Sequence, residues 1–189
     1  MSGPKPARSN ALHNRRWFLK SSSIALLSAA FPQIIQANIN KSSERTLEFV
    51  NLHTNETLDC CYWRNGRYDP TALAQIDYLL RDHRAEEVYP IDRQLLDLLH
   101  SLRDFAGSKA PFEVISGYRS PKTNTHLRNT TGGVAKRSLH MQGKAIDVRL
   151  PDIKLANLRD MAVALQNGGV GYYAKSNFLH IDIGRTRRW

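Results

Sequence analysis

The stretch SLHMQGKAID, residues 138–147, places a histidine, a glycine and an aspartate where a polar loop runs into an apolar strand. Side chains alternate along a strand, so KAIDVRL (144–150) has two distinct faces. One face would hold Ile146, Val148 and Leu150, and the other Ala145, Asp147 and Arg149. An unpaired carboxylate inside an apolar strand is costly, so we expect Asp147 to have a partner.

A second strand near the end of the sequence offers that partner. In NFLHIDI (177–183), one face holds Leu179, Ile181 and Ile183, and the other Phe178, His180 and Asp182. If the two strands are neighbours, His180 can approach Asp147. His140 can fold back over them, because Gly143 allows the loop to bend sharply. Two histidines and one carboxylate form a three-ligand zinc site that leaves a position for water. By spacing alone, ordinary surface or hydrogen-bonded residues are the alternative.

The remaining sequence predicts a single α+β domain, residues 38–189, with a mainly antiparallel sheet and flanking helices. The expected hairpin is 45–52 with 57–63, the helices are 70–84, 90–107 and 152–169, and the other strands are 112–118, 144–150, 170–173 and 177–183. Residues 119–139 are polar and basic and are expected to form a long loop, a feature that is often functional. No glycine-rich phosphate loop follows a strand, so nucleotide binding has no support.

Residues 1–37 have the three-part order of an export signal. Basic residues come first, the apolar run IALLSAAF (24–31) follows, and Ala37 offers a small residue for cleavage. Arg15 and Arg16 make the segment similar to a twin-arginine signal, which exports folded proteins. The apolar run is too short for a permanent membrane helix, so no permanent anchor is expected.

The charge balance also depends on this segment. The chain has 27 Lys and Arg against 17 Asp and Glu, a net charge of +10. Without the five basic residues of 1–37, the remaining 22 basic and 17 acidic residues leave +5. A mildly basic surface suits an anionic polymer, whereas the absence of a basic–aromatic stripe or known motif gives nucleic acid no support. The two cysteines, Cys60 and Cys61, are adjacent and would face opposite sides of a strand, so we expect unpaired, semi-apolar residues.

The stretch 138–147 matches the pattern S-x-H-x-x-G-x-A-x-D in full. This pattern resembles the zinc D-Ala-D-Ala peptidases and their murein endopeptidase relatives, which share a fold with the hedgehog signalling domain. SGYRS (116–120) and GGVGYYAKSNFLHIDIG (168–184) resemble the same family. From residue 47 to 189 the sequence is similar to the MepK-like murein endopeptidases. The resemblance implies this fold and covers essentially the whole chain.

Carried over residue by residue, the resemblance implies one Zn²⁺ per chain, held by His140, Asp147 and His180. It also gives Arg119 the roles of holding substrate and stabilising the oxyanion, which suits the parallel donors of a guanidinium. Ser138 would bind substrate or shape the loop.

The general base is where this sequence departs from part of the family. The dipeptidase members have a glutamate three residues before the last histidine ligand, and here that position is Asn177. Asp182 lies on the ligand face and could be the base, or it could orient His180. His126 is a weaker candidate, because a solvated loop histidine explains it as well. Tyr172 and Tyr173 could line the cleft, with core packing expected for at least one of them.

Together these features predict a periplasmic zinc peptidase, exported by the twin-arginine route, that acts on peptidoglycan peptides. The resemblance implies cleavage of cross-links, including those between two diaminopimelate residues. One alternative is a carboxypeptidase or dipeptidase that trims D-Ala from stem peptides. Another is a non-catalytic, zinc-stabilised module that binds the cell wall.

Overall fold

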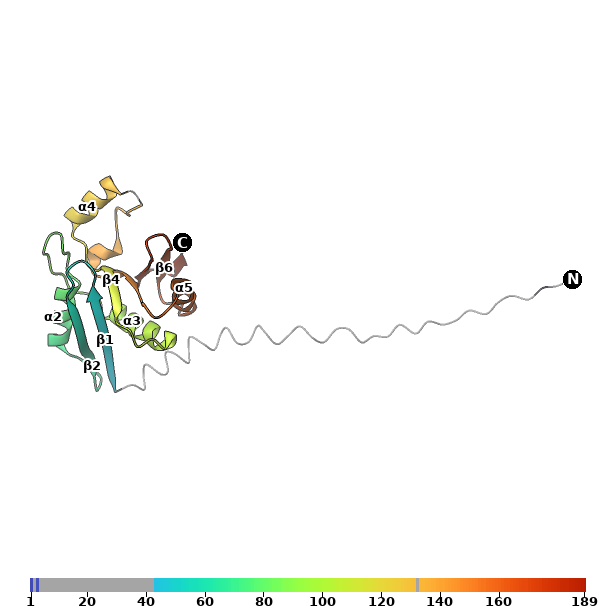
Figure 1. The fold of residues 1–189 in the computed structure, drawn as a ribbon, viewed down its shortest axis with the longest axis horizontal. Coiled ribbons are helices and arrows are strands. Elements are labelled where there is room, and N and C mark those ends of the chain that lie inside the picture. Colours follow the sequence, from blue (N-terminus) through green and yellow to red (C-terminus); the bar gives the residue numbers. More distant parts are fainter. Residues whose placement is uncertain (2, 4–42, 132) are drawn as a thin grey trace.

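A computed structural model describes residues 1, 3, 43–131 and 133–189 (Figure 1). The predicted export signal therefore falls outside the described residues, apart from residues 1 and 3. Within the part of the chain that is described, no helix is both long enough and apolar enough to cross a membrane.

The described chain is built on one eight-stranded sheet with the order β3-β2-β1-β4-β5-β7-β6-β8. Five of the seven neighbouring pairs are antiparallel, and β1–β4 and β6–β8 are parallel. The predicted mainly antiparallel α+β fold is thus confirmed. The strands are β1 (Glu44–Asn51), β2 (Thr57–Arg64), β3 (Arg67–Tyr68), β4 (Phe112–Ser116), β5 (Ala145–Arg149), β6 (Gly169–Tyr173), β7 (Phe178–Asp182) and β8 (Arg187–Arg188).

Three helices pack against this sheet and enclose the apolar core. They are α2 (Pro70–Leu79), α3 (Arg93–Ala106) and α5 (Leu155–Ala164). Each is shorter than the sequence predicts. For α3 the difference lies at its start, because Asp92 caps the helix by accepting a hydrogen bond from the amide of Gln94. Its end is as predicted, since Gly107 adopts a left-handed backbone there. The core includes the fully buried Ile146, Val148 and Leu179, so the predicted apolar faces of β5 and β7 both point toward the helices.

The prediction of a long loop over 119–139 is wrong. Residues Pro121–Thr130 form helix α4, and Leu139–Gln142 form the 3₁₀ helix η1. Ser120 caps α4 by accepting a hydrogen bond from the amide of Thr123, and Pro121 occupies its first turn. The helix buries only Thr123 and Asn124, so it lacks the apolar stripe that would have revealed it in the sequence.

The two short strands β3 and β8 were not predicted either, because two residues are too few to show alternation. Strand β8 pairs with β6 in parallel and extends the sheet beyond the predicted last strand.

The two adjacent cysteines, Cys60 and Cys61, lie on strand β2, and the sequence also predicts a strand there. Cys60 packs against the core, whereas the thiol of Cys61 lies near the carbonyl oxygen of Trp63. Both are free thiols and neither forms a disulfide.

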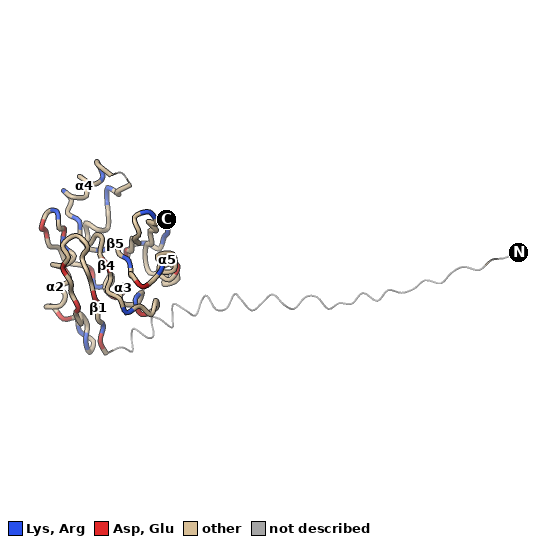
Figure 2. Tube along the Cα trace, in the orientation of Figure 1, with Lys and Arg blue, Asp and Glu red and all other residues tan. Residues whose placement is uncertain are grey.

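Positive charge gathers around α4. Figure 2 shows blue and no red along α4 and the segment that follows it. The sequence agrees, because residues 119–144 contain six Lys or Arg and no acidic residue. This basic segment includes η1 and ends where β5 begins, and these two elements carry the candidate site.

Candidate metal centre

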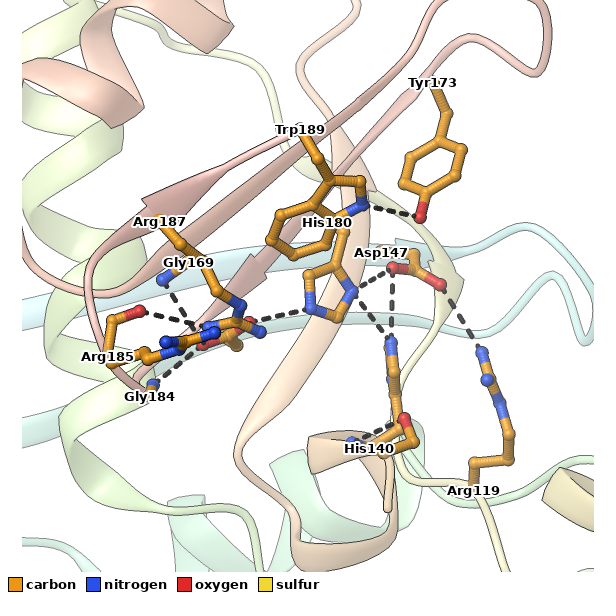
Figure 3. Close-up of polar contacts among 12 residues, drawn as sticks. Arg119, His140, Asp147, Gly169, Tyr173, His180, Gly184, Arg185, Arg187 and Trp189 are labelled. Carbon is orange, nitrogen blue, oxygen red and sulfur yellow. Dashed lines mark hydrogen bonds and ion pairs between the residues drawn. The ribbon is translucent and has the colours of Figure 1, made fainter. Parts of the chain in front are cut away.

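The register between β5 and β7 brings the candidate ligands together. Asp147 lies directly opposite His180, and Ala145 lies opposite Asp182. Their neighbours along the strands point into the core, so these residues occupy the sheet face that is turned away from α2, α3 and α5. His140 reaches the same place from η1, just before β5 (Figure 3).

Three atoms converge at this point. His140 Nε2 is 3.1 Å from His180 Nδ1, and Asp147 Oδ1 is 3.2 Å from the first and 2.9 Å from the second. These are the three residues that the sequence predicts as ligands, and they form the one group of three metal-ligating side chains found in the described chain. A tetrahedral zinc with bonds of about 2.0–2.1 Å needs ligand atoms about 3.3 Å apart. The observed triangle is close to that size.

The outer nitrogen of each imidazole has its own hydrogen bond. His140 Nδ1 lies 2.7 Å from the carbonyl oxygen of Gly117, and His180 Nε2 lies 3.0 Å from Asp182 Oδ2. Each outer nitrogen donates to its acceptor, so each imidazole in its neutral form presents a lone pair at its inner nitrogen. Two such lone pairs and a carboxylate oxygen in contact repel one another unless a proton or a metal cation lies among them. The donor set therefore fits zinc, and its outer contacts are of the kind that orient metal ligands.

The pKa values of His180 and Asp147 are both shifted by their contacts within this group. Burial disfavours charge on His180, but hydrogen bonds to Asp147 and Asp182 outweigh it and raise the pKa of His180 to about 9. Burial would raise the pKa of Asp147, yet the two histidines hold it well below the usual range. In the absence of a metal, the site therefore favours positive charge beside an ionised carboxylate.

The loop that carries His140 is fixed at both ends. The Ser138 hydroxyl caps η1 by accepting a hydrogen bond from the amide of His140. Gly143 ends η1 with φ of +64°, and a Cβ at this position would lie 2.2 Å from the carbonyl oxygen of Pro90. Only glycine fits both the backbone conformation and the space. The predicted bend at Gly143 is thus present.

Arg119 lies beside the three ligands and is mostly buried. One terminal nitrogen is 3.5 Å from Asp147 Oδ2 and donates to the Ser116 hydroxyl at 3.2 Å. Its Nε is buried and has no hydrogen-bond partner among the described residues. Burial lowers the pKa of Arg119, with partial compensation from Asp147, but a guanidinium remains charged at neutral pH. Arg119 is thus a cation with spare donor capacity next to the site.

Asp182 contacts His180 at Nε2, whereas His140 and Asp147 contact the same ring at Nδ1. It is fully buried, and both its oxygens are occupied. Oδ1 accepts from the amides of Gly169 and Gly184 and from Arg187, while Oδ2 accepts from His180 and, at 2.6 Å, from Arg187. These hydrogen bonds keep the pKa of Asp182 well below its usual range despite burial. Of the two roles that the sequence left open, these contacts favour orienting His180.

Arg187 and Trp189 also belong to this site, although the sequence did not predict them. Besides holding Asp182, Arg187 lies 4.8 Å from the Trp189 ring, and that ring is 5.4 Å from the ring of His180. Both side chains lie directly against glycines of β6. A Cβ on Gly169 would lie 2.5 Å from Arg187, and a Cβ on Gly171 would lie 2.7 Å from Trp189. The glycines in GGVGYY were the available signal.

Known proteins are similar to this sequence over nearly its whole length. A family model described as peptidoglycan L,D-endopeptidase MepK matches residues 40–189. The chain belongs to this family. It is 40% identical over 176 residues to peptidoglycan L,D-endopeptidase MepK of Escherichia coli (strain K12), which covers 93% of this chain and 97% of that protein. It is 38% identical over 177 residues to the probable peptidoglycan L,D-endopeptidase MepK of Haemophilus influenzae, with 93% and 95% covered. The resemblance seen in the sequence is confirmed.

The other candidates lie outside the three-ligand group of this MepK family member. Asn177 is exposed in the turn before β7, with φ of +52°. His126 is exposed on α4. Tyr172 packs against the core, as expected for one of the two tyrosines. Tyr173 stacks on Phe178 at 4.6 Å and accepts a hydrogen bond from the Trp189 indole.

Proposed function

We propose that this protein is a zinc-dependent murein endopeptidase that hydrolyses peptide cross-links of peptidoglycan. The observation that carries the proposal is the convergence of His140 Nε2, Asp147 Oδ1 and His180 Nδ1, with both outer imidazole nitrogens engaged. One zinc ion per chain would be held by these three residues. Relatives named as peptidoglycan L,D-endopeptidases, similar over nearly their whole length, support the substrate class.

Bound zinc would supply a water with its pKa lowered to about 7 and would polarise the scissile carbonyl. The chain's own part in the chemistry falls first to Arg119. The charge of its guanidinium and its position beside Asp147 suit it to bind a substrate carboxylate or the developing oxyanion. Ser138, whose hydroxyl already caps η1, would hold His140 in place.

Asp182 acts in this proposal as a positioning residue for His180. A base must reach the attacking water, whereas both oxygens of Asp182 are already committed behind the imidazole. By accepting a hydrogen bond from Nε2, Asp182 fixes the tautomer that presents Nδ1 to the metal. Arg187 and the amides of Gly169 and Gly184 hold Asp182 in turn.

A periplasmic location agrees with peptidoglycan as the substrate. A twin-arginine signal in residues 1–37 would deliver the folded enzyme to the periplasm, where peptidoglycan lies. The basic segment 119–144 beside the site would attract an anionic polymer. Cross-links between two diaminopimelate residues are the finer substrate proposal.

A digestion tests the proposal. Purified cross-linked muropeptides would be incubated with the zinc-loaded protein, with the Asp147→Asn variant and with an exposed control on α5, Asp160→Asn. We expect the protein and the control to convert dimers to monomers, and Asp147→Asn to be inactive. Product masses would identify the bond.

Two other results would overturn the proposal. Intact dimers that lose only terminal D-Ala would indicate a carboxypeptidase or dipeptidase. Unchanged muropeptides that nevertheless bind the zinc-loaded protein would indicate a non-catalytic cell-wall module.

A further inference from the structure

The face of the sheet that carries the metal centre continues one step further along the strands. Asp147, His180 and Gly171 lie side by side across β5, β7 and β6. Arg149 follows Asp147 by two residues on β5, so it lies on the same face of the sheet. It is paired with Glu113 of β4. The matching positions on β7 and β6 are Phe178 and Tyr173, which are paired with each other. A second row of side chains therefore runs parallel to the metal row, about 7 Å away.

This second row combines an ion pair with an aromatic pair. Arg149 donates through Nε to Glu113 Oε2, and Tyr173 stacks on Phe178. The Arg149 and Glu113 side chains remain 29% and 23% exposed. No further hydrogen bond of this guanidinium is found among the described residues, so its terminal nitrogens remain available as donors. The row thus offers one accessible positive and one accessible negative group.

A cavity of about 240 Å³ lies next to this ion pair. Glu113 and Arg149 line it together with Asn177 and apolar residues of the segment 150–155. Its lining therefore combines charged and polar side chains with apolar ones. Such a mixed lining suits a small ligand that has a charged end and a short aliphatic stem.

We infer that Glu113 and Arg149 form a subsite for a zwitterionic amino acid head, with Arg149 binding its carboxylate and Glu113 its ammonium group. This inference rests on the proposed function. The residue that supplies the scissile carbonyl would carry this head at the end of its side chain, as diaminopimelate does. Its two amino acid centres are joined by three methylene groups, a separation of about 5 Å. That length approaches the spacing between the metal row and the second row.

The chemistry of the pair favours a zwitterion over a singly charged group. A lone carboxylate would compete with Glu113 for Arg149, and a lone ammonium would compete with Arg149 for Glu113. A zwitterion instead completes a ring of four alternating charges, in which each group keeps an opposite neighbour. The subsite would therefore distinguish diaminopimelate from its carboxamide, in which one charge is removed with little change of shape.

The test compares two cross-linked dimers that differ only in this group, one with the free carboxylate and one with the carboxamide. We expect the zinc-loaded protein to cleave the free acid with a kcat/KM about 10- to 100-fold higher, the range for one charge-assisted hydrogen-bonded contact. The Arg149→Gln variant should lose this preference, mainly by slower cleavage of the free acid. The Arg64→Gln variant, which removes an exposed cross-strand ion pair with Glu44 at the other end of the sheet, is the matched control and should keep it.

A charge swap separates recognition from a purely structural role. The double variant Glu113→Arg with Arg149→Glu retains a cross-strand ion pair but exchanges the positions of the two charges. We expect it to regain the folding stability that Arg149→Gln loses, measured by urea unfolding, without regaining the preference for the free acid. If the swap restores the preference, the pair is structural and the inference is overturned.

Two further outcomes are decisive. Equal cleavage of both dimers by the unaltered protein, or an unchanged preference in Arg149→Gln, would overturn the subsite and leave the proposed function standing. Cleavage of neither dimer by the zinc-loaded protein would overturn the proposed function, and the subsite with it.

Discussion

At the scale of single residues, the metal centre depends on which imidazole nitrogen faces inward. The sequence pattern predicts which three residues meet, because strand alternation places Asp147 and His180 on matching faces. The pattern does not predict the acceptor for the outer nitrogen of His140. This acceptor is the backbone carbonyl of Gly117, which is far from His140 in the sequence. Nor does the pattern show that Asp182 is enclosed by Arg187, because that contact needs the unpredicted strand β8.

The first prediction concerns Asp182. Its replacement by Asn keeps the volume but removes the charge that fixes His180, so zinc affinity should fall by about 10- to 100-fold. Competition with a chromophoric chelator measures this change. The matched control, Asp160→Asn, changes an exposed carboxylate on α5 and should bind zinc like the unaltered protein. Unchanged zinc affinity in Asp182→Asn would show that Asp182 does not orient His180.

The second prediction concerns Arg119. Its replacement by Gln removes a charged donor beside the ligands, so kcat/KM on cross-linked muropeptides should fall by about 10²- to 10³-fold. Zinc content should stay the same, because Arg119 contacts the ligand Asp147 at its second oxygen, Oδ2, at 3.5 Å, and not at the oxygen that faces the two histidines. Steady-state kinetics and metal analysis of the same preparation test both parts. Near-normal activity with full zinc would rule out the proposed role.

At the scale of secondary-structure elements, alternation and capping signals predicted the main strands and the three core helices. The failures have physical causes. Helix α4 has almost no apolar face, so periodicity could not reveal it, although its Ser-Pro start was visible in the sequence. Strand β8 is held by tertiary contacts across glycines and not by a pattern of its own.

Two glycines with nearly the same backbone provide a test of the η1 turn. Gly107 and Gly143 have φ of +63° and +64°, but a Cβ would meet another atom within 4 Å only at Gly143, where the backbone of Pro90 lies. Gly107→Ala should cost about 1–2 kcal/mol from the left-handed conformation alone. Gly143→Ala should cost about 1–3 kcal/mol more because of the overlap, and it should also weaken zinc binding. Urea unfolding measures both, and equal losses would contradict this account of the turn.

Strand β2 carries a pH-dependent prediction. Burial raises the pKa of the Cys60 thiol from 9.0 to about 11, with nearby Asp59 adding to it. Only the thiolate is nucleophilic, so at pH 8 Cys60 should react with iodoacetamide about 100-fold more slowly than an ordinary thiol. The rate should continue to rise toward pH 11. A Cys61→Ser background isolates Cys60, and urea-unfolded protein is the control; equal rates in the folded and unfolded states would contradict the prediction.

At the scale of the whole molecule, the two faces of one sheet have different roles, one in folding and one in the candidate site. The helices bury one face as the core, and the opposite face carries the ligands, Arg119 and the second row. The family resemblance, the α+β class and the meeting of the three ligands could all be predicted from sequence. The contacts that complete the site could not, because they join η1, β4, β6 and β8 through tertiary packing.

The most direct test of the central claim is a zinc titration of the metal-free protein that follows bound zinc and the cleavage of cross-linked muropeptide dimers together. The account predicts that activity is absent without metal, rises in proportion to bound zinc and reaches its maximum at one zinc per chain. The His140→Ala variant should neither bind zinc tightly nor cleave. Full activity in the metal-free protein, or tight binding of one zinc without any cleavage, would contradict the account.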